Sequence, residues 1–144
     1  MNKPDYISKP DWELLTKKFQ DKLEFLEEKI HSNYPVQYLI GDVDFLGNII
    51  SINEDVLIPR FETELLVEKT IKILKNDYVN KLKILDIGTG SGCIAISLAK
   101  ALNSEVWALD ISSQALKVAK SNAKQNNVKI HLIEKDILKE ELDN

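Results

Sequence analysis

The sequence predicts an α/β protein whose second half is the first part of a doubly wound parallel sheet, preceded by a helix and a β-hairpin. Three short apolar segments, 82–87, 105–109 and 128–133, alternate with helical patterns. Connections this short between strands and helices indicate right-handed crossovers and therefore parallel strands. Three glycines within the five residues 88–92 form the first strand-to-helix turn, and a helix capped by Ser112 or Ser113 follows the second strand.

The first predicted element is a helix that begins with Ser8 as its cap. An apolar stripe follows at steps of three and four residues: Trp12, Leu15, Phe19, Leu23, Leu26 and Ile30. This spacing predicts one amphipathic helix of about five turns. It ends before Pro35, because the residue preceding a proline avoids helical geometry. The stripe has to pack on something.

After residue 40 the apolar residues no longer follow the spacing of a helix, and their new pattern predicts a hairpin over 41–53. Val43 and Phe45 precede a turn at Gly47-Asn48, and a second short strand follows it. An extended segment, 56–59, comes next. A second amphipathic helix then starts at Thr63 and Glu64 and ends near 75–76.

Composition limits the class of protein. The chain has 144 residues, 44% of them hydrophobic and 29% charged, with a net charge of −4. That length favours one compact domain with an appendage, and the mild acidity argues against a duplex DNA binder. No apolar run approaches the ~20 residues of a membrane span. The N-terminus, MNKPDYISKPDW, lacks an apolar signal core, so a cytoplasmic location is expected.

Metal and thiol chemistry have little support in the sequence. Cys93 is the only cysteine and lies in an apolar helical pattern, which is typical of a core residue. His31 and His131 have no partner at ligand spacing. We therefore expect no metal site.

The glycine loop does not match a phosphate-binding motif. A Walker loop requires a lysine after its last glycine, and none occurs before Lys100. Gly88, Gly90 and Gly92 give Gly-x-Gly-x-Gly, with Cys93 where the third glycine of the dinucleotide fingerprint would lie. A ligand without a pyrophosphate has less need of that arrangement.

Two aspartates suggest what the loop binds. Asp110 lies at the carboxyl end of the second strand, where a carboxylate can accept hydrogen bonds from ribose hydroxyls. Asp86 adds a negative charge just before the loop. Two acids without a neighbouring cation suit S-adenosylmethionine, which carries a ribose, a sulfonium and an ammonium group.

The same residues carry a family resemblance. LDIGTGSGCIAI resembles motif I of class I (Rossmann-like) methyltransferases that depend on S-adenosylmethionine, and ALDISSQALKVAKSNAKQN resembles their second-strand segment. PVQYLIGDVDFLG and LIPRFETELLVE resemble the HemK-type branch, the protein-(glutamine-N5) methyltransferases. The resemblance extends from about residue 35 to residue 144, and LIPRFETE is its most specific part.

The resemblance implies a substrate and a site. That branch methylates the glutamine amide in the Gly-Gly-Gln motif of peptide chain release factors. The implied cofactor-binding residues are Gly88, Thr89, Gly90, Ser91 and Gly92 for the methionine part, Asp110 for the ribose, and Asp136 and Ile137 beside the adenine. Asp136 could equally be a helix-cap or turn acid. LIPRFETE could form one wall of the cofactor site, or it could simply be the N-terminus of a helix, where acidic residues are favourably placed.

The chain departs from the family in one respect. It contains no Asn-Pro-Pro-Tyr, the catalytic signature that follows the fourth strand in the family, so no catalytic residue is assigned. The implied domains are 1–34, a remnant of the helical substrate-recognition domain; 35–60, a hairpin linker; and 61–144, the first half of the methyltransferase domain. Such a half-sheet leaves an open edge, which favours a truncated product or self-association through exposed apolar surfaces.

Three alternatives remain open. The first is an amino-methyltransferase of the same superfamily that acts on a nucleic-acid base, which LIPRFETE disfavours. The second is a dinucleotide-dependent oxidoreductase, which would bind NAD rather than S-adenosylmethionine. The third is a non-catalytic interaction module that works through the first helix stripe and forms a stable dimer.

Overall fold

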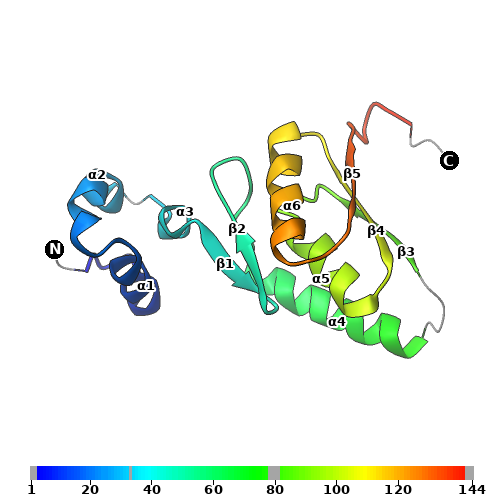
Figure 1. Cartoon of the computed structure of the whole chain (residues 1–144), viewed down its shortest axis with the longest axis horizontal. Helices are drawn as coiled ribbons and strands as arrows, with labels where there is room; N and C mark the ends of the chain where they lie inside the picture. Colours follow the sequence, from blue (N-terminus) through cyan, green and yellow to red (C-terminus); the bar gives the residue numbers. More distant parts are fainter. Residues whose placement is uncertain (1–2, 33, 78–81, 142–144) are drawn as a thin grey trace. The chain divides into compact units, whose positions relative to one another are not determined.

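The computed structural model describes residues 3–32, 34–77 and 82–141 and divides into two compact units, 1–42 and 43–144 (Figure 1). Each unit has its own elements. The first contains α1 (Lys9–Phe19), the 3₁₀ helix η1 (Gln20–Leu26), α2 (Glu27–His31) and α3 (Val36–Ile40). The strand β1 (Asp42–Phe45) begins at the boundary, and the second unit continues with β2 (Asn48–Ser51), α4 (Phe61–Asp77), β3 (Lys83–Ile87), α5 (Cys93–Leu102), β4 (Glu105–Asp110), α6 (Ser113–Gln125) and β5 (His131–Glu134).

The predicted first helix starts as expected but is not continuous. The Ser8 hydroxyl accepts a hydrogen bond from the backbone N–H of Asp11 at 3.2 Å, which caps α1. At Gln20 the backbone takes a φ of 43°, and the chain continues as a 3₁₀ helix and then α2. The prediction of one five-turn helix is therefore wrong beyond Phe19.

The break allows the stripe to bury itself within its own unit. Leu15 and Ile30 are fully buried, and the other four stripe residues pack against them together with Ile7, Val36 and Ile40. A straight helix of the same sequence would hold these side chains along one exposed line. The expectation that the stripe is exposed and favours self-association is therefore wrong, because the stripe forms the core of this unit.

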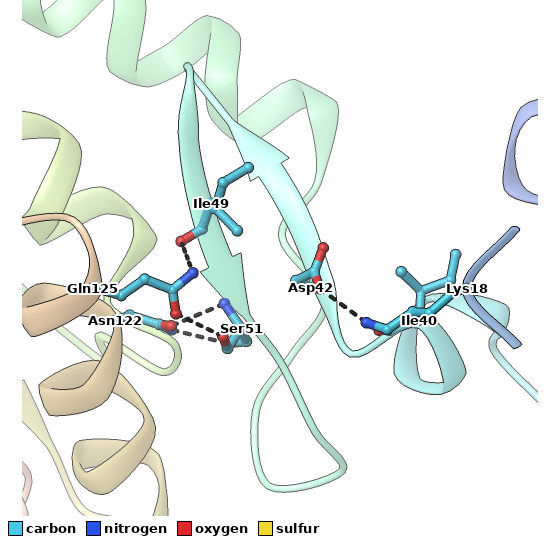
Figure 2. Close-up of polar contacts among 7 residues, drawn as sticks. All are labelled: Lys18, Ile40, Asp42, Ile49, Ser51, Asn122 and Gln125. Atoms are coloured by element: carbon cyan, nitrogen blue, oxygen red, sulfur yellow. Dashed lines mark hydrogen bonds and ion pairs between the residues drawn. The ribbon is translucent and has the colours of Figure 1, made fainter. Parts of the chain in front are cut away.

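The short helix α3 was not predicted. It ends at Gly41, whose φ of 84° is the left-handed conformation typical of a helix C-terminus. Lys18 of α1 holds this end, since its ammonium group pairs with the Asp42 carboxylate at 3.2 Å and donates to the carbonyl of Ile40 (Figure 2).

The predicted hairpin is confirmed. β1 and β2 form a two-stranded sheet whose turn residues, Leu46 and Gly47, have φ values of 51° and 74°. Positive φ at both positions is the type I′ geometry of tight hairpins. Asn48, expected in the turn, instead begins β2 and is buried. Its amide donates to the hydroxyl of Ser97 at 3.1 Å and accepts from Lys100 at 2.8 Å, which fixes the hairpin to α5.

The predicted α/β fold and its parallel sheet are confirmed. The strand order is β3-β4-β5, with both pairs parallel and Leu85, Trp107 and His131 in register. Right-handed crossovers place α5 and α6 on the same side of this sheet, and α4 packs against α5 (Figure 1).

The apolar segment 82–87 predicts a buried strand, but β3 is less buried than that prediction. In the central strand β4, Val106 and Ala108 are fully buried, as expected for parallel strands. In β3, Leu85 and Ile87 are 40% and 54% exposed, because they alternate with the buried Asp86 and so point away from the face of the sheet that α5 and α6 cover. Within the same residues, no helix combines the length and apolarity needed to cross a bilayer.

Candidate functional site

The carboxyl ends of the three parallel strands bring the predicted site residues together. The glycine loop 88–92 follows β3, Asp110 ends β4, and Asp136 follows β5 by two residues. Backbone hydrogen bonds join the three ends. The amides of Gly88 and Thr89 donate to the carbonyl of Leu109 at 2.8 and 3.0 Å, and the amide of Lys135 donates to the carbonyl of Asp110 at 3.1 Å. Open α/β sheets bind ligands at this edge.

Asp110 organises the edge through both of its carboxylate oxygens. Oδ2 accepts a hydrogen bond from the backbone N–H of Gly90 at 2.8 Å, and Oδ1 accepts one from the backbone N–H of Ser112 at 2.9 Å. The carboxylate therefore links the glycine loop to the start of α6. Each carboxylate oxygen has more than one acceptor site, so the half-buried group can still receive hydroxyl donors.

The loop glycines divide into two kinds. All three have positive φ, from 52° to 80°. A Cβ added to Gly88 or Gly90 would meet nothing within 4 Å, so backbone here is open to a ligand. A Cβ on Gly92 would lie 3.0 Å from the Cβ of Ala119 and 3.2 Å from its Cα. Gly92 thus allows the loop to pack closely against α6, just as the third glycine of the dinucleotide fingerprint allows close packing between helix and strand.

Asp86 is turned inward rather than toward a ligand. Its Oδ2 accepts from the hydroxyl of Thr89 at 2.7 Å, and the backbone N–H of Ala95 in the first turn of α5 also donates to it. Burial raises the pKa of Asp86, although these hydrogen bonds oppose the shift. The Asp86 carboxylate thus takes the place of a capping side chain at the N-terminus of α5, because the N-cap residue Gly92 has no side chain.

The side chains of Thr89 and Ser91 are also buried. This part of the loop therefore presents backbone, not hydroxyl groups, to the open side. A ligand that binds here would meet mainly peptide N–H and C=O groups, together with the Asp110 carboxylate.

Asp136 and Ile137 lie at the same sheet edge, in a turn after β5. The Asp136 carboxylate accepts from the backbone N–H of Leu138 at 3.0 Å and pairs with the ammonium group of Lys139 at 3.0 Å. These contacts fit the turn-acid interpretation. Ile137 is half-buried. A role for either residue beside an adenine stays a prediction.

Sequence reasoning missed one residue that reaches the loop. Asn122 of α6 is fully buried, and its amide donates to the carbonyl of Ser91 at 2.9 Å. The sequence marked Asn122 as one of the residues at familiar positions of the family's second-strand segment, but it gave no role to this side chain.

Solved structures share this fold. An S-adenosylmethionine-dependent methyltransferase from Agrobacterium tumefaciens superposes with a TM-score of 0.56 at 21% identity, covering 68% of this chain and 33% of that one. A tRNA (uracil-54, C5)-methyltransferase from Pyrococcus abyssi, solved with S-adenosyl-L-homocysteine, gives 0.53 at 24% identity, covering 64% and 22%. Likeness at this level shows the fold class alone.

The sequence comparisons define the family. The model named Ribosomal protein L11 methyltransferase (PrmA) matches residues 66–144, more than half of the chain. The chain therefore belongs to this family of S-adenosylmethionine-dependent methyltransferases.

Curated relatives resemble a longer stretch of the chain. Release factor glutamine methyltransferase of Flavobacterium psychrophilum is 45% identical over 98% of this chain. The proteins of the same name from Streptococcus pneumoniae and Lactococcus lactis are 42% and 45% identical over 94% and 92% of it. These matches confirm the predicted resemblance. The chain spans about half the length of these relatives, between 48% and 50%.

Proposed function

We propose that this chain is the cofactor-binding half of a release factor glutamine methyltransferase that acts in the cytoplasm on translation factors. One observation carries the proposal. The open backbone at Gly88 and Gly90 lies beside the Asp110 carboxylate at the carboxyl edge of a parallel sheet. This arrangement supports a nucleoside ligand with a small, flexible, charged extension, which describes S-adenosylmethionine.

Each part of the site suits one part of the cofactor. Asp110 would accept hydrogen bonds from the ribose hydroxyls, and the loop 88–92 would hold the methionine part through backbone groups. Asp136 and Ile137 would border the adenine. When bound, S-adenosylmethionine supplies a methyl group activated by its sulfonium charge. The protein's contribution to such a reaction is to hold donor and acceptor in line.

The substrate proposal follows the relatives rather than the name of the family model. That model covers only residues 66–144, whereas the relatives also match the hairpin and the LIPRFETE segment. We therefore propose the Gly-Gly-Gln glutamine amide of release factors as the target. Ribosomal protein L11 is the second candidate, which the family model favours.

Cofactor binding is the direct test of this proposal. Titration calorimetry with S-adenosylhomocysteine should show binding to the 144-residue chain. Asp110→Ala should weaken that binding tenfold or more, on the order of 1.4 kcal/mol. Glu134→Ala is the matched control, because Glu134 is the register partner of Asp110 on β5. Equal losses in both variants, or preference for NAD over S-adenosylhomocysteine, would contradict the assignment.

Methyl transfer is a separate test. No catalytic residue is proposed here, because the 144 residues contain no Asn-Pro-Pro-Tyr. Incubation with radiolabelled S-adenosylmethionine and a release factor should leave the factor unlabelled, as should incubation with L11. Clear turnover by this chain would contradict the idea that it holds only the cofactor half.

Self-association remains part of the proposal. The apolar side chains that support it lie on β3 and α4: Leu65, Leu66, Ile73, Leu85 and Ile87 are exposed. Apolar surface of this kind favours association. Light scattering should report a mass above that of a monomer, and a monomer at micromolar concentration would reject the idea.

A further inference from the structure

Asn122 uses its whole amide group to join two segments that are far apart in the sequence. Its Oδ1 accepts from the backbone N–H of Ser51 at 2.8 Å, and its Nδ2 donates to the carbonyl of Ser51 at 2.9 Å (Figure 2). The same Nδ2 donates to the carbonyl of Ser91 at 2.9 Å. The amide thus pairs with β2 as a neighbouring strand would, and its second N–H reaches the glycine loop.

The contact with Ser91 fixes one peptide plane of the loop from both sides. The carbonyl of Ser91 and the N–H of Gly92 belong to the same planar peptide unit. Asn122 holds the carbonyl, and the N–H donates to the carbonyl of Thr89 at 2.8 Å. With both ends bonded, this plane cannot rotate without loss of a buried hydrogen bond. It sets the path by which the chain leaves the open backbone at Gly88 and Gly90.

Neighbouring amides show that Asn122 differs from a simple hairpin anchor. Gln125 and Asn126 lie three and four residues later, on the same face of the helix. The Gln125 side chain accepts from the hydroxyl of Ser51 at 3.1 Å, and the Asn126 amide donates to the carbonyl of Ile49 at 2.8 Å (Figure 2 shows Gln125). Both contacts reach only the hairpin. Of these three side-chain amides, only that of Asn122 donates a hydrogen bond to the glycine loop.

We propose that Asn122 is a positioning residue for the cofactor site, which couples the hairpin strand β2 to the glycine loop. The inference rests on the proposed role of this loop in binding S-adenosylmethionine. No other common side chain reproduces the contacts. Aspartate lacks both donors and would face two carbonyl oxygens, and alanine leaves three backbone groups unpaired. The hairpin thereby becomes part of the support of the site rather than a linker alone.

The test compares Asn122→Ala with two controls that perturb the fold elsewhere. Gln125→Ala removes a hairpin contact without touching the loop, and Val67→Ala opens a cavity in α4, where Val67 is buried. All variants are compared at a temperature well below their melting midpoints. Asn122→Ala should weaken binding of S-adenosylhomocysteine about tenfold, the effect of one lost buried hydrogen bond, while both controls stay near wild type. If Val67→Ala, at equal loss of stability, weakens binding as much, the coupling is rejected.

Hydrogen exchange provides a second readout that does not need a ligand. Asn122→Ala should speed amide exchange both in 88–92 and around 49–51, whereas Gln125→Ala should affect only 49–51. Unchanged exchange in 88–92 would overturn the inference even if cofactor binds. Faster exchange there in a protein that binds no cofactor would uphold the coupling and reject the proposed function instead. Asn122→Ser, a milder change, replaces Asn122→Ala if the latter does not fold.

Discussion

Gly92→Ala should be the most destabilising single-methyl change in the glycine loop. Two costs add at this position. The residue has a φ of 80°, a conformation that costs a residue with a Cβ roughly 1–2 kcal/mol. The new methyl group would also lie 3.0 Å from the Cβ and 3.2 Å from the Cα of Ala119. Since the second atom is backbone of a packed helix, α5 and α6 would have to separate, and such overpacking costs about 1–3 kcal/mol.

Gly88→Ala isolates the first of these costs. Its φ of 73° is similar, but nothing lies within 4 Å of the added methyl group. The expected loss is about 1–2 kcal/mol for Gly88→Ala against about 2–5 kcal/mol for Gly92→Ala. The larger value is a substantial part of the ~5–15 kcal/mol that stabilises a typical domain.

Urea unfolding followed by circular dichroism measures both free energies, and a double variant tests the cause. Ala119→Gly removes the Cβ that Gly92→Ala would meet, so the two changes together should cost less than their sum. Cofactor binding should show the opposite order, with Gly88→Ala worse because its methyl group occupies the open side. Equal losses of stability in the two alanine variants, or strict additivity with Ala119→Gly, would refute this reasoning.

Two further predictions concern buried polar groups. Because burial raises the pKa of Asp86, its ionisation opposes folding, and the stability that the protonated group provides is lost as the pH rises through the raised pKa. The stability of Asp86→Asn relative to wild type should therefore increase in urea titrations as the pH rises above about 4 and through the raised pKa, and a difference independent of pH would argue against it. Asn48→Leu should cost about 1–3 kcal/mol, because the carbonyl of Phe45 and the hydroxyl of Ser97 lose their buried partner. Lys100→Ala should cost less than Asn48→Leu, because Lys100 is exposed and water can replace its ammonium group as the donor to Asn48. Thermal melts of the two variants measure both losses.

The sequence was informative wherever a local pattern decides the structure. Period-two and period-3.6 hydrophobicity placed the hairpin and the strand–helix alternation, and glycine spacing with Asp110 located the sheet edge where the candidate site lies. The boundary of a helix was harder to predict. The stripe from Trp12 to Ile30 has unbroken helical spacing, yet the chain turns at Gln20 because folding back buries the stripe.

Side-chain partners across the fold were decided only by the tertiary structure. Asp86 and Asp110 look alike in the sequence, yet one caps a helix from inside and the other holds the loop at the open edge. Gly92 resembles Gly88 until Ala119 packs against it. The polar residues Asn48 and Asn122 carry no periodic signal, because their partners lie 49 and 71 residues away in the chain. Periodicity reports which face of an element is buried, whereas packing alone determines which buried groups meet.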